Sequence, residues 1–498
     1  MKVRKRRPAV YSAYSPAFPH EKRQKRDNGK RKRRSVPTLT YQDWLEAAAS
    51  GEGKIDFIRR VISEHCASGA YLEAVTNKAY YDGENPTIMR YEKVLFDLEG
   101  RAHKDLWTAN HKIASSFFGF AVDQAVFYLL GNGVSFKKDD SKKKLGKDFD
   151  QQLMKAALYA QIAGVSYALW NYDRLIPFRL TEFAPLKDEE TGAVRAGIRF
   201  WRLAENKPLR VTFYEADGFS EYGENRAERI LRETRPKTPY NLLRRVSGMG
   251  AAVIGGANYP DFPIVPLRCG DDEKSALNGK RNTIDALDLA RSKMVNNTDE
   301  GNLIYWVLKN YGGMDNVNLA QFVNSVKALH AVKVNTEDAH DDIEAHTLEA
   351  PFEGTQATID GLLKQLYEDF QCFNAAAVTA SNQSATAVRA SYVPLDLKTD
   401  KFEAQVTLFI QKILALAGID DEPTYTRNQI INIQEAVQSI TMAAQYFDEA
   451  YTTKKLLTIL GDADQYDEMM KRKDAEGLER LSTAPDEEEK PVRISGFQ

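Results

Sequence analysis

The chain has 498 residues, of which 43% are hydrophobic and 28% are charged. This is the composition of an ordinary globular protein that is too long for one small core. It contains no run of about 18 uncharged apolar residues and no signal-peptide core at its N-terminus, so we expect neither a membrane span nor conventional secretion. Its three cysteines, Cys66, Cys269 and Cys372, lie far apart without metal-binding spacing, which predicts buried, reduced thiols rather than disulfides.

The formal net charge of −2 conceals an uneven distribution of charge along the chain. Residues 1–34 hold 14 Lys and Arg against 2 Asp and Glu, which leaves 54 basic and 68 acidic residues elsewhere. The basic residues gather in clusters that contain Lys5, Arg6, Arg7, Arg31, Lys32, Arg33 and Arg34. Because this segment has little to pack into a core, we predict a disordered basic arm over residues 1–39. Such an arm binds DNA or an acidic partner through counterion release, or is a solubilising tail without a dedicated role.

Helical patterns dominate from residue 40 to about residue 165. The clearest pattern lies in Trp107–Phe136, where apolar residues recur at helical spacing, stop at a Gly-Asn-Gly sequence and are followed by a strand-like alternation. We expect Gly131 and Gly133 to supply the positive φ angles of a C-terminal cap. Residues 137–148 predict a charged surface loop.

From about residue 167 the hydrophobic period changes to two, which predicts antiparallel strands at residues 168–170, 196–201 and 209–214. A long polar helix is then predicted from about residue 274 to residue 297. Its apolar stripe consists of Leu277, Ile284, Leu287 and Met294. Because the stripe is narrow for a helix buried in its own subunit, we expect this helix to pack beside copies of itself. The fold class is therefore α+β, predominantly helical.

Residues 301–354 form a compact insert between this helix and a second one. The insert contains strand-like runs at residues 303–308 and 331–334 and a short helical pattern at residues 319–329. It carries 3 Lys against 8 Asp and Glu, a balance of −5. The second helix, Thr355–Phe373, has apolar residues at the full helical spacing.

Residues 374–388 contain no charged side chain and only small or amide ones, apart from two valines, so a constraint on bulk and charge acts there. The alternatives are a flexible linker or an Ala-rich helix. Pro394 is expected to kink or break the helical path that follows. Further helices are predicted at residues 402–417, 428–446 and 452–460, followed by a loose tail.

The sequence contains no recognisable catalytic motif. It lacks a phosphate-binding P-loop, residues 247–250 lack the third glycine of a dinucleotide-binding turn, and residues 164–168 miss the second glycine of a nucleophile elbow. His340 and His346 would lie on different faces of a helix, and no cysteine accompanies them. We therefore expect no enzymatic activity, no cofactor and no metal.

The segment Trp107–Phe136, taken as a whole, resembles the signature of portal proteins from tailed double-stranded DNA bacteriophages, of the siphophage type. The matching residues are Asn110, Asp123, Gln124, Tyr128, Leu130, Gly131 and Asn132. Phe262–Val265 ahead of the first long helix, Asp285 and Asp288 on that helix, and Ser384–Val388 before a later helix also match. The resemblance covers about residues 80 to 420.

The order of the predicted elements then implies the organisation of a portal subunit. Its regions are a disordered arm at residues 1–39, a wing at 40–270, a first stem helix at 271–300, a clip at 301–354, a second stem helix at 355–373, a tunnel loop at 374–388, a wing helix at 389–420, crown helices at 421–475 and a flexible acidic tail at 476–498. The resemblance implies that such subunits assemble as a ring around a central channel.

The resemblance also implies a function, as the ring of about twelve subunits at one capsid vertex through which the genome is packaged and ejected. Its partners would be double-stranded DNA, the terminase large subunit, the head-tail adaptor, scaffold and the major capsid protein, with no membrane. It would be assembled in the host cytoplasm and reside in the virion. The tunnel-loop residues implied to face DNA are Asn374, Thr379, Ser381, Asn382, Gln383 and Ser384. The clip residues implied to contact a partner are Asp338, Asp341, Asp342 and Glu344.

Two hypotheses of other classes remain open from the residues alone. One is a basic-armed nucleic-acid-binding structural protein whose body only dimerises. The other is a metal-dependent nuclease that uses clustered acids such as Asp338, Asp341 and Glu344. A ring of about a dozen copies would exclude the first, and a cleavage assay with a divalent metal separates the second.

Overall fold

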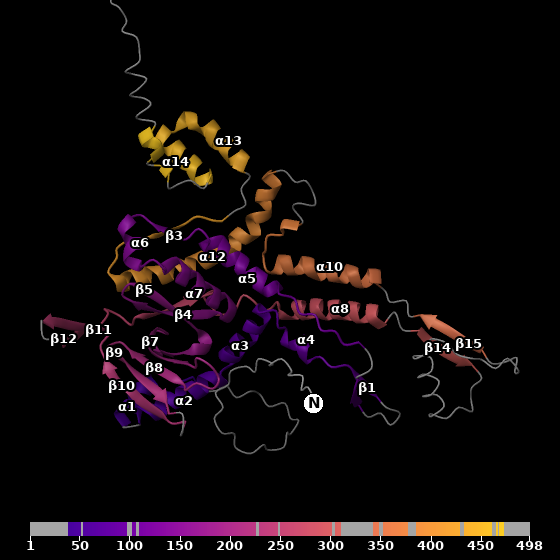
Figure 1. The fold of residues 1–498 in the computed structure, drawn as a ribbon, viewed down its shortest axis with the longest axis horizontal. Coiled ribbons are helices and arrows are strands. Elements are labelled where there is room, and N and C mark those ends of the chain that lie inside the picture. Colours follow the sequence, from indigo (N-terminus) through magenta and orange to yellow (C-terminus); the bar gives the residue numbers. More distant parts are fainter. Residues whose placement is uncertain are drawn as a thin grey trace, which may run out of the picture. The chain divides into compact units, whose positions relative to one another are not determined.

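Figure 1 shows a computed structural model of the chain. It describes residues 38–50, 53–96, 102–105, 109–225, 229–247, 250–300, 304–309, 342–347, 352–376, 385–428, 433–460, 465–466 and 468–472. The chain divides into two compact units, one of residues 1–382 and 388–428, the other of residues 383–387 and 429–498. Both larger sheets belong to the first unit.

The N-terminal half of the first unit mixes helices and strands, as the sequence predicts. The helices are α1 (Tyr41–Ser50), α2 (Lys54–Ala67), α3 (Gly69–Tyr81), α4 (Pro86–Arg90), α5 (Phe117–Leu130), α6 (Asp139–Leu145) and α7 (Phe149–Ala163). The strands of the larger sheets are β4 (Val165–Asn171), β5 (Arg174–Arg179), β6 (Phe183–Lys187), β7 (Val194–Trp201), β8 (Arg210–Glu215), β9 (Gly218–Glu224), β10 (Leu231–Thr238) and β13 (Ile264–Arg268). Two-stranded pairs are formed by β1 (Val94–Phe96) with β2 (Ala102–Lys104), β11 (Asn241–Ser247) with β12 (Gly250–Ala257), and β3 (Val134–Phe136) with β16 (Pro423–Tyr425).

The two larger sheets are antiparallel throughout. One has five strands in the order β10-β9-β8-β7-β6, and the other has three in the order β13-β4-β5. The predicted strands at residues 168–170, 196–201 and 209–214 are confirmed as parts of β4, β7 and β8. The strand-like alternation after Gly133 is confirmed as β3, whereas β1 and β2 interrupt a region that was predicted to be helical.

Helices cover one face of each sheet. On the five-stranded sheet, the ring of Trp44 in α1 meets the edge of Phe213 in β8 at 5.0 Å between centroids, and Phe57 and Ile58 of α2 are buried in the same cluster. On the three-stranded sheet, α7 packs against β4 and β5. The apolar face of these strands, which the alternating sequence predicted, is therefore covered by a helix.

Helix α5 lies at the centre of the main core. It packs against α3 and α7, and the apolar face of α12 (Ala385–Ala417) joins the same cluster through Phe402, Val406 and Phe409. The C-terminal cap differs in part from the prediction, since Gly133 has φ +73° whereas Gly131 is helical.

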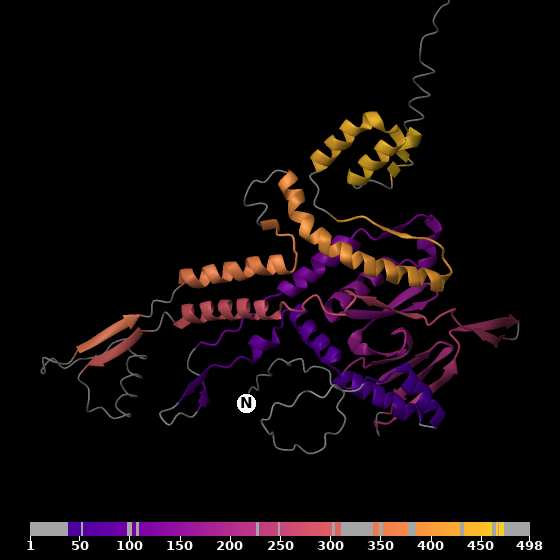
Figure 2. The ribbon, with the colours of Figure 1, turned by 180° about the vertical axis from the view of Figure 1, so that it is seen from behind.

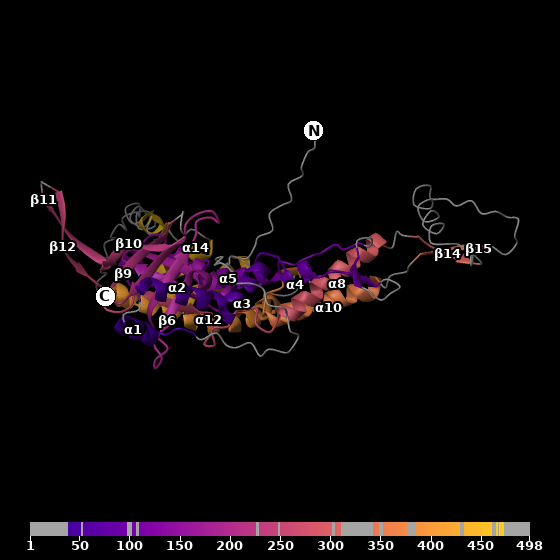
Figure 3. The ribbon, with the colours of Figure 1, turned by 90° about the horizontal axis from the view of Figure 1, so that it is seen from below.

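Two long helices, α8 (Arg281–Glu300) and α10 (Phe352–Asp369), lie side by side in the first unit (Figures 1 and 3). The predicted start of α8 at residue 274 is wrong, because residues 275–280 form turns that end with Gly279 at φ +77°. Between α8 and α10 in the chain, β14 (Ile304–Lys309) pairs with β15 (Asp342–Thr347), which confirms the first predicted strand of the insert. The short helix at residues 319–329 and the strand at 331–334 lie outside the described residues.

Helix α12 continues through Pro394, so of the two outcomes predicted there, a kink or a break, the helix does not break. The proline removes one backbone donor within the helix, and Figure 2 shows the ribbon of α12 changing direction along its length. The buried apolar side chains that follow, including Phe409, Ile410 and Ile413, keep the helix attached to the core on the far side of the proline.

The prediction of a loop at residues 137–148 is also wrong. These residues contain α6, and Leu145 at its end is completely buried in the main core. Asp421 stabilises the start of this helix, because its carboxylate accepts hydrogen bonds from Lys138 N at 3.0 Å and from Ser141 Oγ at 2.6 Å. The sequence analysis missed this helix because Leu145 is a single apolar residue among many charged ones, and because the capping residue Asp421 lies far along the chain.

The described part of the second unit contains α13 (Ile433–Ala443), a single 3-10 turn, η2 (Ala444–Tyr446), and α14 (Glu449–Leu460). These helices confirm the two patterns predicted between residues 428 and 460. Residues 429–432 and the acidic tail lie outside the described residues.

Replacing Asp421 with Ala should lower stability only at a pH at which the carboxylate is ionised. The Ser141 hydrogen bond, followed by backbone donors, lowers the pKa of Asp421 from 3.8 to about 2. The stabilisation is therefore complete above the unfolded pKa and is lost as the pH falls toward 2. Urea unfolding of the wild type and of Asp421→Ala should differ at pH 6 and converge at about pH 2. In the control Asp420→Ala, the lost carboxylate contacts Lys138 Nζ at 3.7 Å, and a similar pH-dependent difference there would contradict the assignment.

Candidate functional site

Two polar residues in the middle of α5 bond to parts of the chain that are remote in sequence. The hydroxyl of Tyr81 in α3 donates to Asp123 Oδ1 at 2.8 Å. Gln124 makes a reciprocal pair with the backbone of Phe373, donating from Nε2 to Phe373 O at 3.0 Å and accepting from Phe373 N at 2.8 Å. The two Gln124 bonds fix the backbone at the point where the chain leaves α10.

The C-terminal end of α5 makes two more bonds of this kind. The hydroxyl of Tyr128 donates to Asp396 Oδ1 in α12 at 2.6 Å, and Asn132 Nδ2 donates to Thr426 O at 3.3 Å. Asp123, Gln124 and Tyr128 therefore lie on one helix with Asn132 just after its end, and each holds a different segment of the first unit.

Helix α8 presents two carboxylates to α3 and α4. Asn85, which caps α4 through its Oδ1, donates from Nδ2 to Asp285 Oδ1 at 2.9 Å and to Asp288 Oδ2 at 2.8 Å. The hydroxyl of Tyr80 donates to Asp285 Oδ1 at 2.6 Å. Burial raises the pKa of Asp288, against the lowering effect of its hydrogen bonds with Asn85 and Ser115.

The same face of α8 also binds the extended chain that precedes α5. Asp288 Oδ1 accepts from Ser115 N at 3.0 Å, Ser292 Oγ from Ile113 N at 3.0 Å, and Asn296 Oδ1 from a backbone N–H of the same segment at 2.7 Å. The buried face of α8 is thus half polar. The sequence-based expectation of a narrow stripe left for neighbouring copies is corrected, because Ile284 and Leu287 are buried within this chain's own core. The helical spacing of Asp288, Ser292 and Asn296 was the sequence signal that could have predicted this polar face.

Aromatic stacking joins the two ends of the uncharged segment. The ring of Phe373, just before the segment, stacks on Tyr392 of α12 with centroids 4.0 Å apart and planes 10° apart. Tyr392 stacks in turn on Tyr128 of α5 at 5.8 Å and 14°. Leu395 and the partly buried Val388 complete this small cluster. The chain therefore departs at Phe373 and comes back at Tyr392 in one place, which the stacked rings hold fixed.

A buried lysine supports the same place from α12. Lys398 Nζ donates to Phe370 O at 2.9 Å and lies 3.5 Å from Ala121 O, so an ammonium group sits at the C-terminal end of α10. Burial lowers the pKa of Lys398, and it also lowers the pKa of Lys280, whose Nζ lies 4.6 Å from the centroid of the Phe370 ring. The sequence analysis missed Lys398 and Tyr392, and neither residue has a local signal, because their partners are far away in sequence.

Few of the residues that the sequence nominated for binding are described. Asn374 is half-buried, whereas Thr379, Ser381, Asn382, Gln383 and Ser384 lie outside the described residues. Asp342 and Glu344 are two positions apart on β15, opposite Lys309 and Val307 of β14, and they share one face of that hairpin. Asp338, Asp341, all basic-arm residues and His340 lie outside the described residues.

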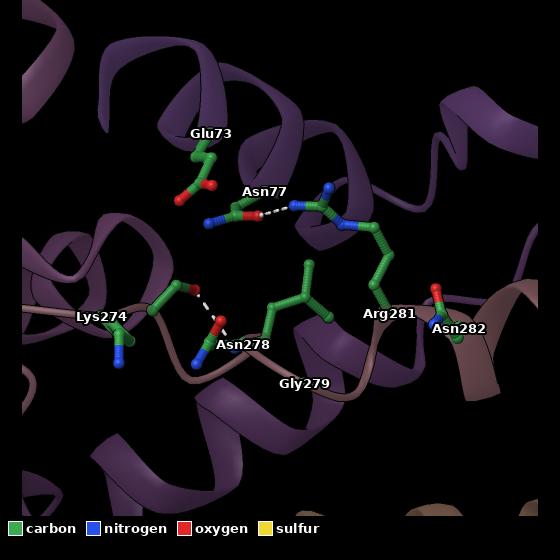
Figure 4. A pocket seen from close by; sticks show the side chains of 9 residues that line it. Glu73, Asn77, Lys274, Asn278, Gly279, Arg281 and Asn282 are labelled. Atoms are coloured by element: carbon green, nitrogen blue, oxygen red, sulfur yellow. Dashed lines mark hydrogen bonds between the residues drawn. The ribbon is translucent and has the colours of Figure 1, made fainter. Parts of the chain in front are cut away.

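A surface cavity of about 250 Å³ lies where α3 meets the turn before α8 (Figure 4). Arg281 donates to Asn77 Oδ1 at 2.9 Å on its wall, and Glu73 and Lys274 also line it. Ser275 also lines the cavity, and its hydroxyl donates a hydrogen bond to the backbone carbonyl of Gln161 rather than to a basic side chain. Within the described residues, no three His, Cys, Asp or Glu side chains converge as for a metal ion, and no helix is both long and apolar enough to cross a membrane.

Comparison with known proteins gives a consistent result. A family model described as phage portal protein, SPP1 Gp6-like, matches residues 69–480. The portal protein of Clostridium phage phiCD119 is 22% identical over 412 residues, which cover 76% of this chain and 87% of that protein. The portal protein of Bacillus phage SPP1 is 23% identical over 428 residues, which cover 77% and 79% of the two chains. A chain from the virion of a native gene transfer agent particle matches with a TM-score of 0.39 and 9% identity over 68% of this chain and 89% of that one.

Replacing Gln124 with Ala should loosen the start of the uncharged segment. Two backbone groups of Phe373 lose their partners, so we expect a loss of about 2–3 kcal/mol of unfolding free energy in urea denaturation. Faster hydrogen exchange at the Phe373 amide would localise the effect. The control is Phe127→Ala on the same helix, whose side chain is 46% exposed and should cost clearly less. Equal exchange at Phe373 in the wild type and Gln124→Ala would refute the role of the Gln124 bonds.

Proposed function

The chain belongs to the SPP1 Gp6-like family of phage portal proteins, which are structural proteins of the virion, and we propose that it forms a ring of about twelve subunits around a channel for double-stranded DNA. In this proposal the ring occupies one capsid vertex, and the genome passes through it during packaging and ejection. In this proposal the two stem helices are α8 and α10, α12 follows the tunnel loop, and the wing, clip and crown are the regions named from the sequence.

The anchored base of the uncharged segment is the observation that carries the channel proposal. Phe373 and Tyr392 stack face to face, and Gln124 holds the backbone of Phe373 by two hydrogen bonds. A segment of 15 residues without charge, residues 374–388, is thereby carried on a fixed base. Such an arrangement suits a constriction, because the base of the segment keeps its place against a moving polymer.

The charge distribution supports DNA as the polymer in the channel. A polyanion that must slide is slowed by each Lys or Arg that it contacts, because every phosphate contact adds binding energy. The segment 374–388 offers no such contact, and the chain outside residues 1–34 has a net charge of −14. Small amide and hydroxyl side chains touch DNA without holding it.

We assign the remaining partners by charge. The insert 301–354, with a balance of −5, is proposed to contact the terminase large subunit and the head-tail adaptor through Asp338, Asp341, Asp342 and Glu344. The arm, with +12 over residues 1–34, is proposed to hold scaffold, the major capsid protein or DNA through contacts that weaken with salt. In this proposal the protein is assembled in the host cytoplasm and resides in the virion.

Lysines in the uncharged segment should stall DNA without preventing assembly. We expect Ser381→Lys combined with Asn382→Lys to form rings of wild-type mass by mass photometry but to slow packaging in an in vitro assay by about tenfold or more, because every subunit adds two phosphate contacts. Asn206→Lys, in an exposed turn, is the matched control and should package normally.

The two readouts test different parts of the proposal. Only monomers and dimers in the wild-type protein would refute the ring. Normal packaging by rings of the double-lysine variant would refute the placement of residues 381 and 382 in the channel.

A further inference from the structure

The hairpin β11–β12 is a part of the first unit that the proposed function does not use. Within the part of the chain that the structure describes, its strands pair only with each other, as a two-stranded sheet, over seven registered residue pairs from Asn241 with Ala257 to Ser247 with Gly250. Figure 3 shows it extending beyond the neighbouring strands β9 and β10. An isolated two-stranded hairpin is marginal in water, so a hairpin of this length implies a further contact.

The base of the hairpin is held firmly. The hydroxyl of Tyr240, just before β11, donates to Glu215 O at 2.7 Å, and its backbone N–H donates to Asn258 Oδ1 at 3.1 Å. Tyr259, just after β12, packs against the ring of Tyr240 in a tilted arrangement, with centroids 5.5 Å apart, and stacks on Tyr172 with centroids 4.9 Å apart. The hairpin therefore leaves the sheet in a direction set by hydrogen bonds and packed rings rather than by a free linker.

The base also has a steric requirement. A Cβ atom on Gly256 would lie 2.5 Å from Pro239 Cγ, so the strand passes against the proline only because this position is glycine. Residues 255–257 are exposed. The close packing of Pro239 on Gly256 supports the same fixed direction.

The edges of this hairpin differ from the edges of the two larger sheets. The outer strands of the two larger sheets each contain a proline: Pro236 in β10, Pro185 in β6, Pro266 in β13 and Pro177 in β5. Proline removes a ladder donor and so discourages the addition of another strand. By contrast, β12 has eight residues with neither proline nor charge. Its free edge is open to pairing with another chain.

We propose that this free edge of β12 pairs with the free edge of β11 in a second copy of this chain. The two strands of the hairpin are antiparallel, so the next copy's β11 continues the alternation beside β12. The two arginines of the hairpin, Arg244 and Arg245, are both on β11, so an uncharged β12 always separates charged strands. Like charges are thus never directly opposite in the extended ladder.

This inference rests on the proposed ring, because only a closed ring lets every copy use both edges of its hairpin. In the extended ladder, equivalent residues of neighbouring copies are two strands apart, or about 10 Å. One introduced cysteine per copy, Ala252→Cys, would therefore come within reach of a short bismaleimide on the next copy. Ala252 lies opposite Arg245, away from the irregular pairing near Ile254.

The experiment treats the full-length protein carrying Ala252→Cys with the cross-linker and resolves the products on a denaturing gel. We expect cross-linked dimers on the gel, because each copy carries one introduced thiol, which adds to one maleimide and so joins the copies in pairs. The unmodified chain controls for the native cysteines, and Glu205→Cys in an exposed turn controls for random collision. Adding Val253→Lys should lower the cross-linked fraction by about tenfold, because a lysine on an edge strand opposes strand addition.

Mass photometry of the same samples separates this inference from the proposed function. Rings with no more cross-linking in Ala252→Cys than in Glu205→Cys would overturn the hairpin pairing and leave the portal ring intact. Monomers that do not cross-link would overturn both. Cross-linked dimers without rings would support the hairpin pairing and refute the ring.

Discussion

The burial of α5 is the constraint on which the rest of the first unit depends. Ten of its 14 residues are buried, so a polar side chain on this helix is costly unless it finds a partner inside the protein. Asp123, Gln124 and Tyr128 meet this requirement against α3, the end of α10 and α12. One helix thereby sets the position of three segments that are up to 268 residues away in sequence. The anchored base of residues 374–391 is a consequence of the same bonds, because Gln124 and Tyr128 both contact it.

Helix α8 also buries polar side chains against partners inside the protein, but unlike α5 it is mostly polar. Its apolar residues are few, and its buried face is completed by Asp288, Ser292 and Asn296, which bind the backbone leading into α5. An extended segment has no internal partners for its N–H groups, so a polar helix face is a suitable surface to bury it against. The apolar stripe of α8 is used inside the subunit.

The sequence by itself determined those features that arise from neighbouring residues. Period-two alternation located β4, β7 and β8, helical spacing located α5, α10 and the second half of α12, and the spacing of polar residues from Asn110 to Asn132 was enough to indicate the portal family. These signals are local because hydrogen bonding within a helix, or the side-chain period of a strand, repeats within a few residues. The absence of charge from residues 374–388 is equally a property of the sequence, although its role in the channel is a proposal.

Only the tertiary structure decided the features whose cause lies far along the chain. Residues 137–148 are rich in charge, yet α6 forms because Leu145 enters the core and Asp421 binds its first turn. Helix α12 passes through Pro394 because the packing of Phe409 and Ile413 outweighs one lost hydrogen bond. Lys398 and Tyr392 look ordinary in sequence and become anchors only when α12 meets α5 and the end of α10. Local patterns report the energy of a residue with its neighbours, whereas burial and the pairing of remote polar groups exist only once the chain has folded.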